Sequence, residues 1–188
     1  RGLKTQPVTG GYDLVWLDNF SAGGVMSQHL INRGCTTIHF FHRPNSANSV
    51  DLRLSGIRNT VLKNHLKFTA DNIFCGDPAD MASIKNMKVQ PGKTGIICAT
   101  DSTAAVLLSS LENRGIQITR DCLIAGFDNM QYSQYLKDPL TTFLQPCAEM
   151  AGICLEFAIR RIQNNSQIPL TISLQGKLIE RASTEFKG

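Results

Sequence analysis

Short apolar runs alternate along this chain with longer amphipathic segments. The apolar runs have the length of buried strands and cover residues 13–17, 37–41, 95–99, 121–127 and 141–145. The amphipathic segments have the length of helices and cover residues 23–34, 51–65, 101–115 and 147–163. Residues 170–180 are expected to be extended again. Because the apolar runs do not alternate in polarity, the pattern predicts an α/β fold whose parallel sheet lies between helices on both faces.

The ends of these segments carry their own signals. In the first predicted helix, Val25, His29 and Leu30 are among the inward positions, and Gly34 is expected to end the helix as a C-cap. Two proline-containing stretches, "KDPLTTFLQPC" and "NNSQIPLT", are typical of segments that cross between layers rather than of loops within one sheet. The chain contains no internal repeat and no low-complexity segment.

Polar residues follow four of the predicted strands, at the edge where parallel sheets place their ligands. The strand ends offer Asp18 and Asn19, then His42, Arg43 and Asn45, then Thr100 and Asp101, and finally Asp128 and Asn129. Side chains that converge from several strand ends form a concave surface with a few polar groups, as a small-molecule site requires. The sequence therefore predicts such a site at this edge.

Each of these residues also has a local interpretation. Asp101 precedes a helical segment, so a helix N-cap is its expected main role. Thr100 is either a ligand contact or a residue packed at the strand end. Asp128 is equally compatible with an Asx-turn in "FDNM" and with a ligand contact. Arg53 lies at the start of its helix, where an arginine is ordinarily solvated.

Charge and composition narrow the function classes. The chain has 188 residues, of which 42% are hydrophobic and 18% are charged, as in ordinary globular proteins. The net charge of +4 is scattered, with no run of five like charges. A domain that binds nucleic acid by charge alone usually has a denser basic stripe, so this chain by itself is not expected to contact DNA.

The six cysteines favour a reducing compartment. None forms a CxxC pair, and several lie within apolar runs, which is typical of thiols used as small core residues. Neither a signal peptide nor an apolar stretch of 18 residues occurs in the sequence. We therefore expect a cytoplasmic protein without membrane contact. Because the sequence does not begin with methionine, it is consistent with a fragment.

Motifs for catalysis are missing from the sequence. It has no GxSxG, HExxH, P-loop or GxGxxG pattern, and its four histidines lack metal-ligand spacing with the cysteines. We expect no enzyme activity, no metal and no other cofactor. His39, within a strand, is expected to be a packed side chain rather than a base.

Several motifs together resemble the effector-binding domain of the LacI/GalR family of transcriptional regulators. They are "VWLDNFSAGGVMSQHLINRG", "RP" with "RLSGI" after it, "ICATDSTAAVLLSSLENRGIQI", "DCLIAGFDN", "DPLTTFLQPCAEMAGICLEFAIRRI" and "LIERAST". The match runs in order over nearly the whole chain. The threonine pair and the R-x-S-T ending set it apart from most free periplasmic sugar-binding proteins.

The resemblance implies the type I periplasmic-binding-protein fold, in which two subdomains are joined by three hinge crossings. Residues 1–17 and 147–175 would be part of the N-terminal subdomain, and residues 18–145 and 176–188 would form the C-terminal subdomain. The crossings would lie near residues 17–18, 145–147 and 175–177. The rest of the N-terminal subdomain and a helix-turn-helix headpiece, of the LacI or the GntR type, would lie upstream.

The resemblance also implies a ligand site in the cleft between the subdomains. Arg53 would point into the cleft and Asp128 would accept hydrogen bonds from the effector, which suits a guanidinium fork and a carboxylate. Ser49 is a further expected contact, and the strand-end residues Asp18, Asn19 and Asp101 complete the predicted set.

Other positions depart from the family pattern. Thr100 stands where many sugar-binding members have an asparagine, and a threonine hydroxyl cannot replace the two prongs of an amide. The stacking aromatic of some members corresponds roughly to Pro78, with Phe74 the nearest substitute. The implied effector is carbohydrate-like or related, with a purine-like compound as another class.

The implied mechanism is allosteric: the effector stabilises one orientation of the subdomains, and a homodimer relays the change to operator DNA through its headpieces. Two other interpretations stay open. A solute-binding or chemoreceptor-type protein would share the fold without a DNA role. Six unpaired cysteines argue against an exported protein, because thiols are readily oxidised outside the cytoplasm. An enzyme would use Asp101 and Asp128 as a carboxylate pair.

Overall fold

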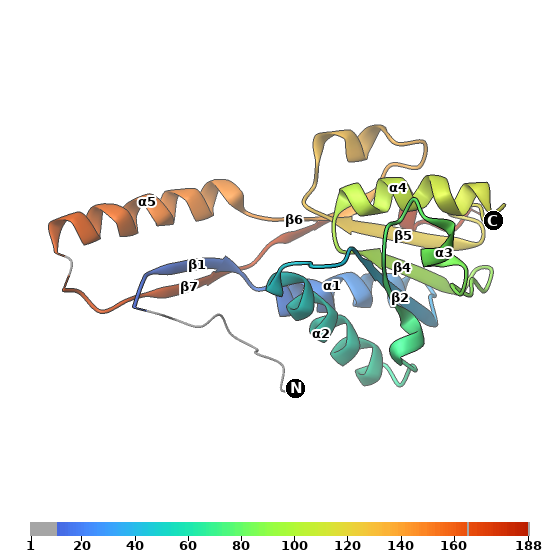
Figure 1. Cartoon of the computed structure of the whole chain (residues 1–188), viewed down its shortest axis with the longest axis horizontal. Helices are drawn as coiled ribbons and strands as arrows, with labels where there is room; N and C mark the ends of the chain where they lie inside the picture. The colour runs from blue at the N-terminus through green and yellow to red at the C-terminus, as the bar shows by residue number, and fades with distance from the viewer. Residues whose placement is uncertain (1–10, 165, 188) are drawn as a thin grey trace.

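Two β-sheets of unequal size organise the molecule (Figure 1). The computed structural model describes residues 11–164 and 166–187. The main sheet has the strand order β3-β2-β4-β5-β6-β8, and the second sheet pairs β1 with β7. The strands are β1 (Leu14–Leu17), β2 (Thr37–His42), β3 (Ile73–Cys75), β4 (Thr94–Cys98), β5 (Cys122–Phe127), β6 (Thr141–Leu144), β7 (Thr171–Leu174) and β8 (Lys177–Ile179). All neighbouring strands pair in parallel except β6 and β8.

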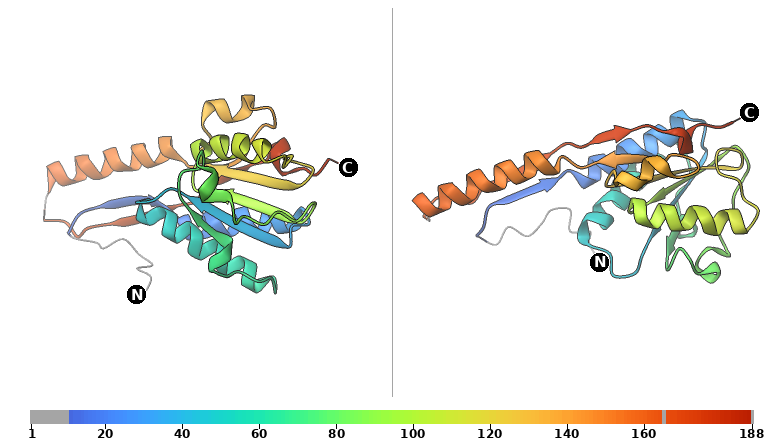
Figure 2. Two further views of the ribbon diagram at one scale, coloured as in Figure 1. Left: turned by 45° about the vertical axis from the view of Figure 1, so that its right-hand side comes forward. Right: turned by 90° about the horizontal axis from the view of Figure 1, so that it is seen from above.

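Helices cover both faces of the main sheet (Figures 1 and 2). The helices are α1 (Asn19–Asn32), α2 (Asn48–Lys63), α3 (Met81–Ile84), α4 (Asp101–Asn113) and α5 (Cys147–Gln163), with short 3₁₀ turns at Ala70–Asn72, Gln131–Tyr135 and Ala182–Thr184. The helices α1 and α2 pack on one face, and α4 packs on the other. The predicted α/β architecture, with a parallel sheet between two helical layers, is confirmed.

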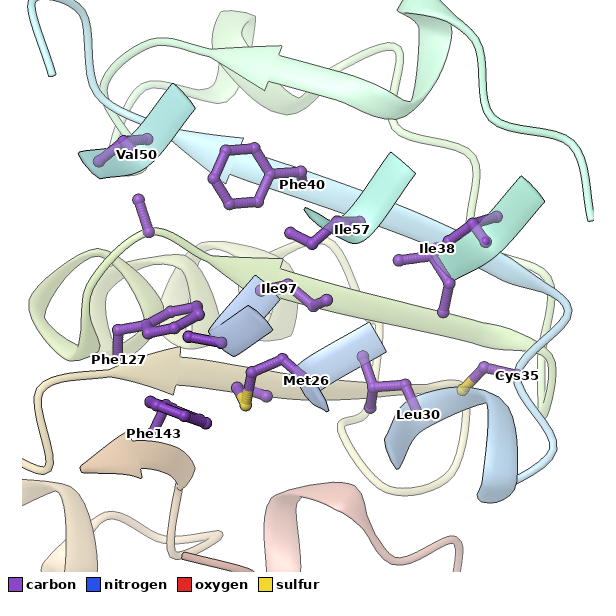
Figure 3. Close-up of a cluster of buried hydrophobic side chains, with 14 of the residues drawn as sticks. Met26, Leu30, Cys35, Ile38, Phe40, Val50, Ile57, Ile97, Phe127 and Phe143 are labelled. Atoms are coloured by element: carbon purple, nitrogen blue, oxygen red, sulfur yellow. The ribbon is translucent and has the colours of Figure 1, made fainter. Parts of the chain in front are cut away.

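The central strands are buried along their whole length. Every residue of β4 and β5 is buried, which explains why their sequences do not alternate in polarity. Figure 3 shows the cluster between the sheet and α1 and α2, where side chains from both helices meet those of the strands. It includes Met26, Leu30, Ile38, Phe40, Ile57, Ile97, Phe127 and Phe143.

The first helix differs from its prediction. It begins at Asn19, four residues before the predicted start, because Asp18 caps it by accepting a hydrogen bond from the Ser21 backbone N–H. Its buried positions include His29 and Leu30, but Val25 is 43% exposed, so the inward prediction for Val25 is wrong. Gly34 follows the helix with φ +93°, as its position after the helix predicts.

Two short elements, β3 and α3, were not predicted from the sequence. The strand β3 has three residues and α3 has four, too few for a period of two or of 3.6 to appear. The prediction that His39 is a packed side chain is confirmed. It is buried in β2, and its Nε2 lies 2.9 Å from the Lys88 carbonyl oxygen.

Glycines allow α1 and α2 to pack against each other at backbone distance. A Cβ atom added to Gly56 would lie 1.9 Å from the Phe20 carbonyl oxygen, and one added to Gly23 would lie 2.1 Å from the Arg53 carbonyl oxygen. Both positions therefore require the absence of a side chain rather than an unusual φ. This close packing fixes the backbone of α2 at Arg53.

The small layer consists of β1, β7 and α5 and extends to one side of the main sheet (Figures 1 and 2). No residue of α5 is buried, and Leu155 and Ile162 are 63% and 85% exposed. The indole N–H of Trp16 in β1 is buried without a hydrogen-bond partner among the described residues. Parallel strands are normally covered on both faces, which this layer does not achieve.

Residues 1–10, which belong to the predicted first segment of the N-terminal subdomain, lie outside the described residues.

Replacing Gly56 by alanine should destabilise the protein because the new methyl group would push α1 and α2 apart. We expect the free energy of unfolding to fall by about 1–3 kcal/mol, as for other overpacked cores. The matched control is Gly152→Ala on α5, where an added Cβ meets nothing within 4 Å. That variant should be stabilised by about 0.5–1 kcal/mol. Equal effects in urea unfolding would contradict the packing argument.

Candidate functional site

A cleft of about 470 Å³ lies beyond the carboxyl ends of the central strands. Its wall is formed by the segments that follow β2, β4, β5 and β6. The lining residues are Arg43, Pro44, Asn45, Ser46, Ala47, Ser49, Val50, Arg53, Ala99, Thr100, Ser102, Thr103, Asp128 and Gln145. Four chain segments that are far apart in sequence thus bring polar side chains to one concave surface.

Three larger hollows lie elsewhere on the surface. One of about 870 Å³ borders β3 and contains His39 and Lys88, one of about 580 Å³ lies around Thr119, and one of about 530 Å³ lies beside the segments that follow β6 and β7. None of the three lies where the strand order turns between β2 and β4, at the carboxyl edge of the main sheet. We therefore take the smaller cleft as the candidate site.

Arg53 is the most constrained residue of the cleft. Its side chain is only 4% exposed, its Nε donates to Asn19 Oδ1 at 2.9 Å, and its Nη1 donates to the Ala99 carbonyl oxygen at 2.7 Å. The guanidinium lies over the Phe127 ring, 4.2 Å from its centroid. Burial lowers the pKa of Arg53, and the negative charge of Asp128 acts in the opposite direction. Nη2 makes no hydrogen bond within the described part of the chain, so it is a free donor at the cleft.

Asp18 and Asn19 support the site without lining the cleft. Asn19 donates to the Leu17 carbonyl oxygen and accepts from Arg53, so it orients the guanidinium. Asp18 accepts from the Ser21 hydroxyl at 2.6 Å and from its N–H at 2.9 Å. Burial acts to raise the pKa of Asp18, but these bonds outweigh it and the pKa is lowered. Asp18 is thus a helix cap.

Asp128 also lines the cleft. Its Oδ1 accepts from Gln145 Nε2 at 2.6 Å, and its backbone N–H donates to the Phe143 carbonyl oxygen at 3.0 Å. The carboxylate therefore bonds across to the strand end of β6 rather than to its own turn. Its second oxygen makes no hydrogen bond within the described residues, so Asp128 and Arg53 offer an acceptor and a donor to the same cleft.

Hydroxyl groups line the same cleft. Thr100 caps α4 by accepting from the Thr103 N–H at 3.2 Å, and its hydroxyl lies 2.9 Å from that of Ser102. Ser49, in the first turn of α2, also borders the cleft. The expectation that Asp101 caps α4 is wrong, because Thr100 holds that position.

Asp101 lies beneath the cleft rather than in it. Its side chain is fully buried, with Oδ1 accepting from the Thr142 hydroxyl at 2.6 Å and Oδ2 from the Met130 N–H at 2.8 Å. Both oxygens are therefore engaged, and Asp101 is not among the residues that line the cleft. Burial raises the pKa of Asp101 to about 6, although the two hydrogen bonds act against the rise.

The residues considered for stacking on a ligand lie outside the cleft. Phe74 packs edge-on against the His39 ring at 5.2 Å, and Pro78 is buried. The cleft has no aromatic lining residue in the described chain. Gln145 also lines the cleft but was not predicted as a site residue, because the sequence pattern places it last in the extended segment 141–145, whereas β6 ends at Leu144.

Other classes of site are not evident in the described chain. No group of three histidine, cysteine or acidic side chains is placed to hold a metal ion in residues 11–164 and 166–187. All six cysteines are free thiols. No helix within these ranges is both long and apolar enough to cross a membrane.

Asp101→Asn should change how stability depends on pH. The folded state holds the Asp101 proton more tightly than the unfolded state, because the carboxyl pKa rises from 3.8 to about 6 on folding. The free energy of unfolding should therefore fall as pH rises from about 4 to about 6, by on the order of 2–3 kcal/mol from this group. Urea unfolding measured across this pH range tests the prediction. Because an asparagine cannot ionise, the free energy of unfolding should depend on pH more steeply in the wild type than in the variant. Parallel profiles would contradict the assignment.

Comparisons with known proteins agree with the fold. The family model described as the periplasmic binding protein-like domain matches residues 27–184. Among curated proteins, the HTH-type transcriptional repressor PurR of Vibrio atlanticus (strain LGP32) is 27% identical over 177 residues, which are 90% of this chain and 52% of that protein. The chain spans about half the length of the curated relatives it matches.

Solved structures show the same fold. A LacI family transcriptional regulator from Enterococcus faecium with bound ribose matches with a TM-score of 0.82 and 24% identity, over 98% of this chain and 69% of that one. The transcriptional regulator CelR in complex with cellobiose matches with a TM-score of 0.85 and 21% identity, over 94% of this chain and 56% of that one. The chain therefore belongs to the family of periplasmic binding protein-like domains, and the relatives named above are transcriptional regulators.

Proposed function

We propose that this domain binds a small carbohydrate-like effector in the cleft and thereby controls operator binding by a headpiece encoded upstream. The observation that carries the proposal is that Arg53 and Asp128 line the same cleft, each with a hydrogen-bonding atom that has no partner among the described residues. A donor and an acceptor that are each fixed by other hydrogen bonds suit a ligand that presents several hydroxyl groups.

The polar lining supports the same ligand class. Ser49, Thr100 and Ser102 add hydroxyl groups that both donate and accept. Ribose and cellobiose are bound by two regulators of this fold, and we extend that ligand class to this chain by analogy. The lack of an aromatic platform in the described lining implies that any stacking surface comes from elsewhere in the complete protein.

The small layer supports a hinged, two-lobed mechanism. We assign residues 1–17 and 147–175 to an N-terminal subdomain that is completed upstream, and residues 18–145 and 176–188 to the C-terminal subdomain. The chain passes between the sheets at three places, after β1, after β6 and after β7. Two of these crossings touch, since Gln175 Nε2 donates to Asp18 Oδ2 at 3.2 Å.

A second contact joins one of these crossings to the site. Gln145, at the start of the second crossing, donates to the cleft acid Asp128. An effector that hydrogen-bonds Asp128 would therefore either compete with Gln145 for this carboxylate or strengthen the bond between them. A ligand that binds one lobe orientation more tightly shifts the population toward it, which is the allosteric step we propose.

In the complete protein, we propose a homodimer that carries two DNA-binding headpieces. The hinge rotation would change their separation, which has to match operator half-sites about one DNA turn apart. We further propose a cytoplasmic location and no catalysis. A solute-binding protein of the same fold is the rival, and the upstream sequence discriminates between them: a helix-turn-helix supports a regulator, and a signal peptide supports an exported binding protein.

The experiment that tests the ligand site begins with a thermal-shift screen of pentoses, hexoses, disaccharides and nucleobases. A ligand at 100 times its dissociation constant adds about 2.7 kcal/mol to the stability of the folded state. Compounds that raise the melting temperature are then measured by calorimetry. A response to nucleobases alone would replace the carbohydrate assignment.

Arg53→Lys and Asp128→Asn should each weaken binding of the compound found in this screen at least about tenfold, which corresponds to 1.4 kcal/mol. The lysine lacks the fork that contacts Asn19, Ala99 and the cleft together, and the asparagine lacks the full charge that strengthens the acceptor. The controls are Arg58→Lys, on an exposed position of the same helix, and Asp71→Asn, exposed outside the cleft. Unchanged affinity in both cleft variants would refute the site.

A further inference from the structure

The turn that carries Asp128 has an unfavourable backbone conformation. Asp128 has φ +102° and Asn129 has φ +49°. Positive φ is uncommon for residues other than glycine, and such residues persist only where the surrounding structure fixes them. The groups that fix this turn therefore decide where the Asp128 carboxylate points.

The turn is held from below by a buried pair, Asp101 and Thr142. Asp101 Oδ2 accepts the Met130 N–H at 2.8 Å, and Asp101 Oδ1 accepts the Thr142 hydroxyl at 2.6 Å. The Thr142 oxygen in turn accepts the Asn129 N–H at 3.1 Å. Two successive N–H groups of the turn thus end on one carboxylate–hydroxyl pair that solvent does not reach.

A glycine makes room for this carboxylate. A Cβ atom added to Gly126, in β5, would lie 2.3 Å from Asp101 Oδ1. Any side chain at position 126 would therefore displace the buried acid from under the turn. The "AGFDN" motif therefore contains the turn itself and also Gly126, whose missing side chain leaves room for the acid that bonds the turn.

Arg181 holds the turn from the side. Its Nη2 donates to Asn129 Oδ1 at 2.7 Å, while its Nη1 donates to the Leu140 carbonyl oxygen at 2.7 Å and to the Ser133 hydroxyl at 3.0 Å. The guanidinium is thereby fixed on three partners. The Arg181 backbone N–H also donates to the Thr141 hydroxyl at 2.8 Å, so the threonine pair of β6 contacts both supports.

We propose that Asp101, Thr142 and Arg181 are positioning residues of the effector site, which aim the Asp128 carboxylate without touching the ligand. The inference rests on the proposed function for its link to effector binding. It assigns a purpose to the threonine pair and to the R-x-S-T ending, motifs that the cleft itself does not use.

Thr142→Val tests the proposal in the full chain, because it removes the hydroxyl at nearly constant shape. Amide hydrogen exchange by NMR should show protection of Asn129 and Met130 falling at least about tenfold relative to the amides of β4. The Gln145 side-chain amide resonance should shift, because its acceptor on Asp128 moves. Thr142→Ser keeps the hydroxyl and should restore both readouts.

The matched control is Thr94→Val, at the opposite end of β4. Thr94 is also fully buried, and its hydroxyl bonds only the backbone of Gln90 among the described residues. It should lower global stability without a selective effect on the turn. Normal protection of the turn in Thr142→Val, or an equal loss in Thr94→Val, would overturn the proposal.

A second variant covers the case in which Thr142→Val does not fold. Arg181→Lys keeps the charge but cannot bond Asn129, Ser133 and Leu140 at once. It should shift the Asn129 side-chain amide resonance and reduce protection of the turn. The control Arg33→Lys, which alters an arginine that pairs with Glu180 and does not contact the turn, should change neither readout. An unchanged turn in Arg181→Lys would remove Arg181 from the proposal and, with Thr142→Val unfolded, overturn it.

The link to ligand binding is tested with D-ribose by calorimetry. If the wild type binds it, Thr142→Val should raise the dissociation constant at least about tenfold and Thr94→Val should not. Equal dissociation constants for the wild type and Thr142→Val would overturn the positioning role. If the wild type does not bind ribose, the carbohydrate assignment loses support, while the exchange measurement still decides whether the turn is held as proposed.

Discussion

The buried guanidinium of Arg53 sets a condition that much of the fold has to meet. A charge taken out of water requires partners in fixed positions, and those partners come from three separate elements: Asn19 at the start of α1, Ala99 after β4, and the ring of Phe127 in β5. Their convergence depends on the close packing of α1 on α2 that Gly23 permits. A change in the helix pair would therefore alter the cleft without altering any residue that lines it.

A buried acid lies on the other side of the same sheet edge. Asp101, on α4, bonds the turn after β5 and the strand β6, whereas Arg53, on α2, bonds Asn19 of α1 and the backbone after β4 and lies over a ring of β5. The helices that carry the two charged groups lie on opposite faces of the sheet, and the turn that carries Asp128 follows β5 at its edge. This arrangement explains why Asp128 influences the pKa of both residues, upward in each case.

The sequence predicted the layers well because the strands β4 and β5 and the helices α4 and α5 have long, unambiguous patterns. It also predicted that the ends of β2, β4 and β5 meet, because parallel topology places them at one edge. The fourth predicted strand end, after β1, belongs to the second sheet, and the fourth segment of the cleft follows β6 instead. It could not separate residues that line the cleft from residues that support it, since Asp18, Asn19 and Asp101 differ from Thr100 and Asp128 only in orientation. Short elements such as β3, and the exposed position of Val25, depend on neighbours that one sequence does not reveal.

The lone tryptophan has a consequence of a different kind. Trp16 belongs to β1, two residues before the first crossing, and its indole N–H is buried without a partner among the described residues. The main sheet and its helices contain no second indole. The tryptophan fluorescence of this protein therefore originates from the small layer alone, and its emission reports the local environment of β1 next to the hinge.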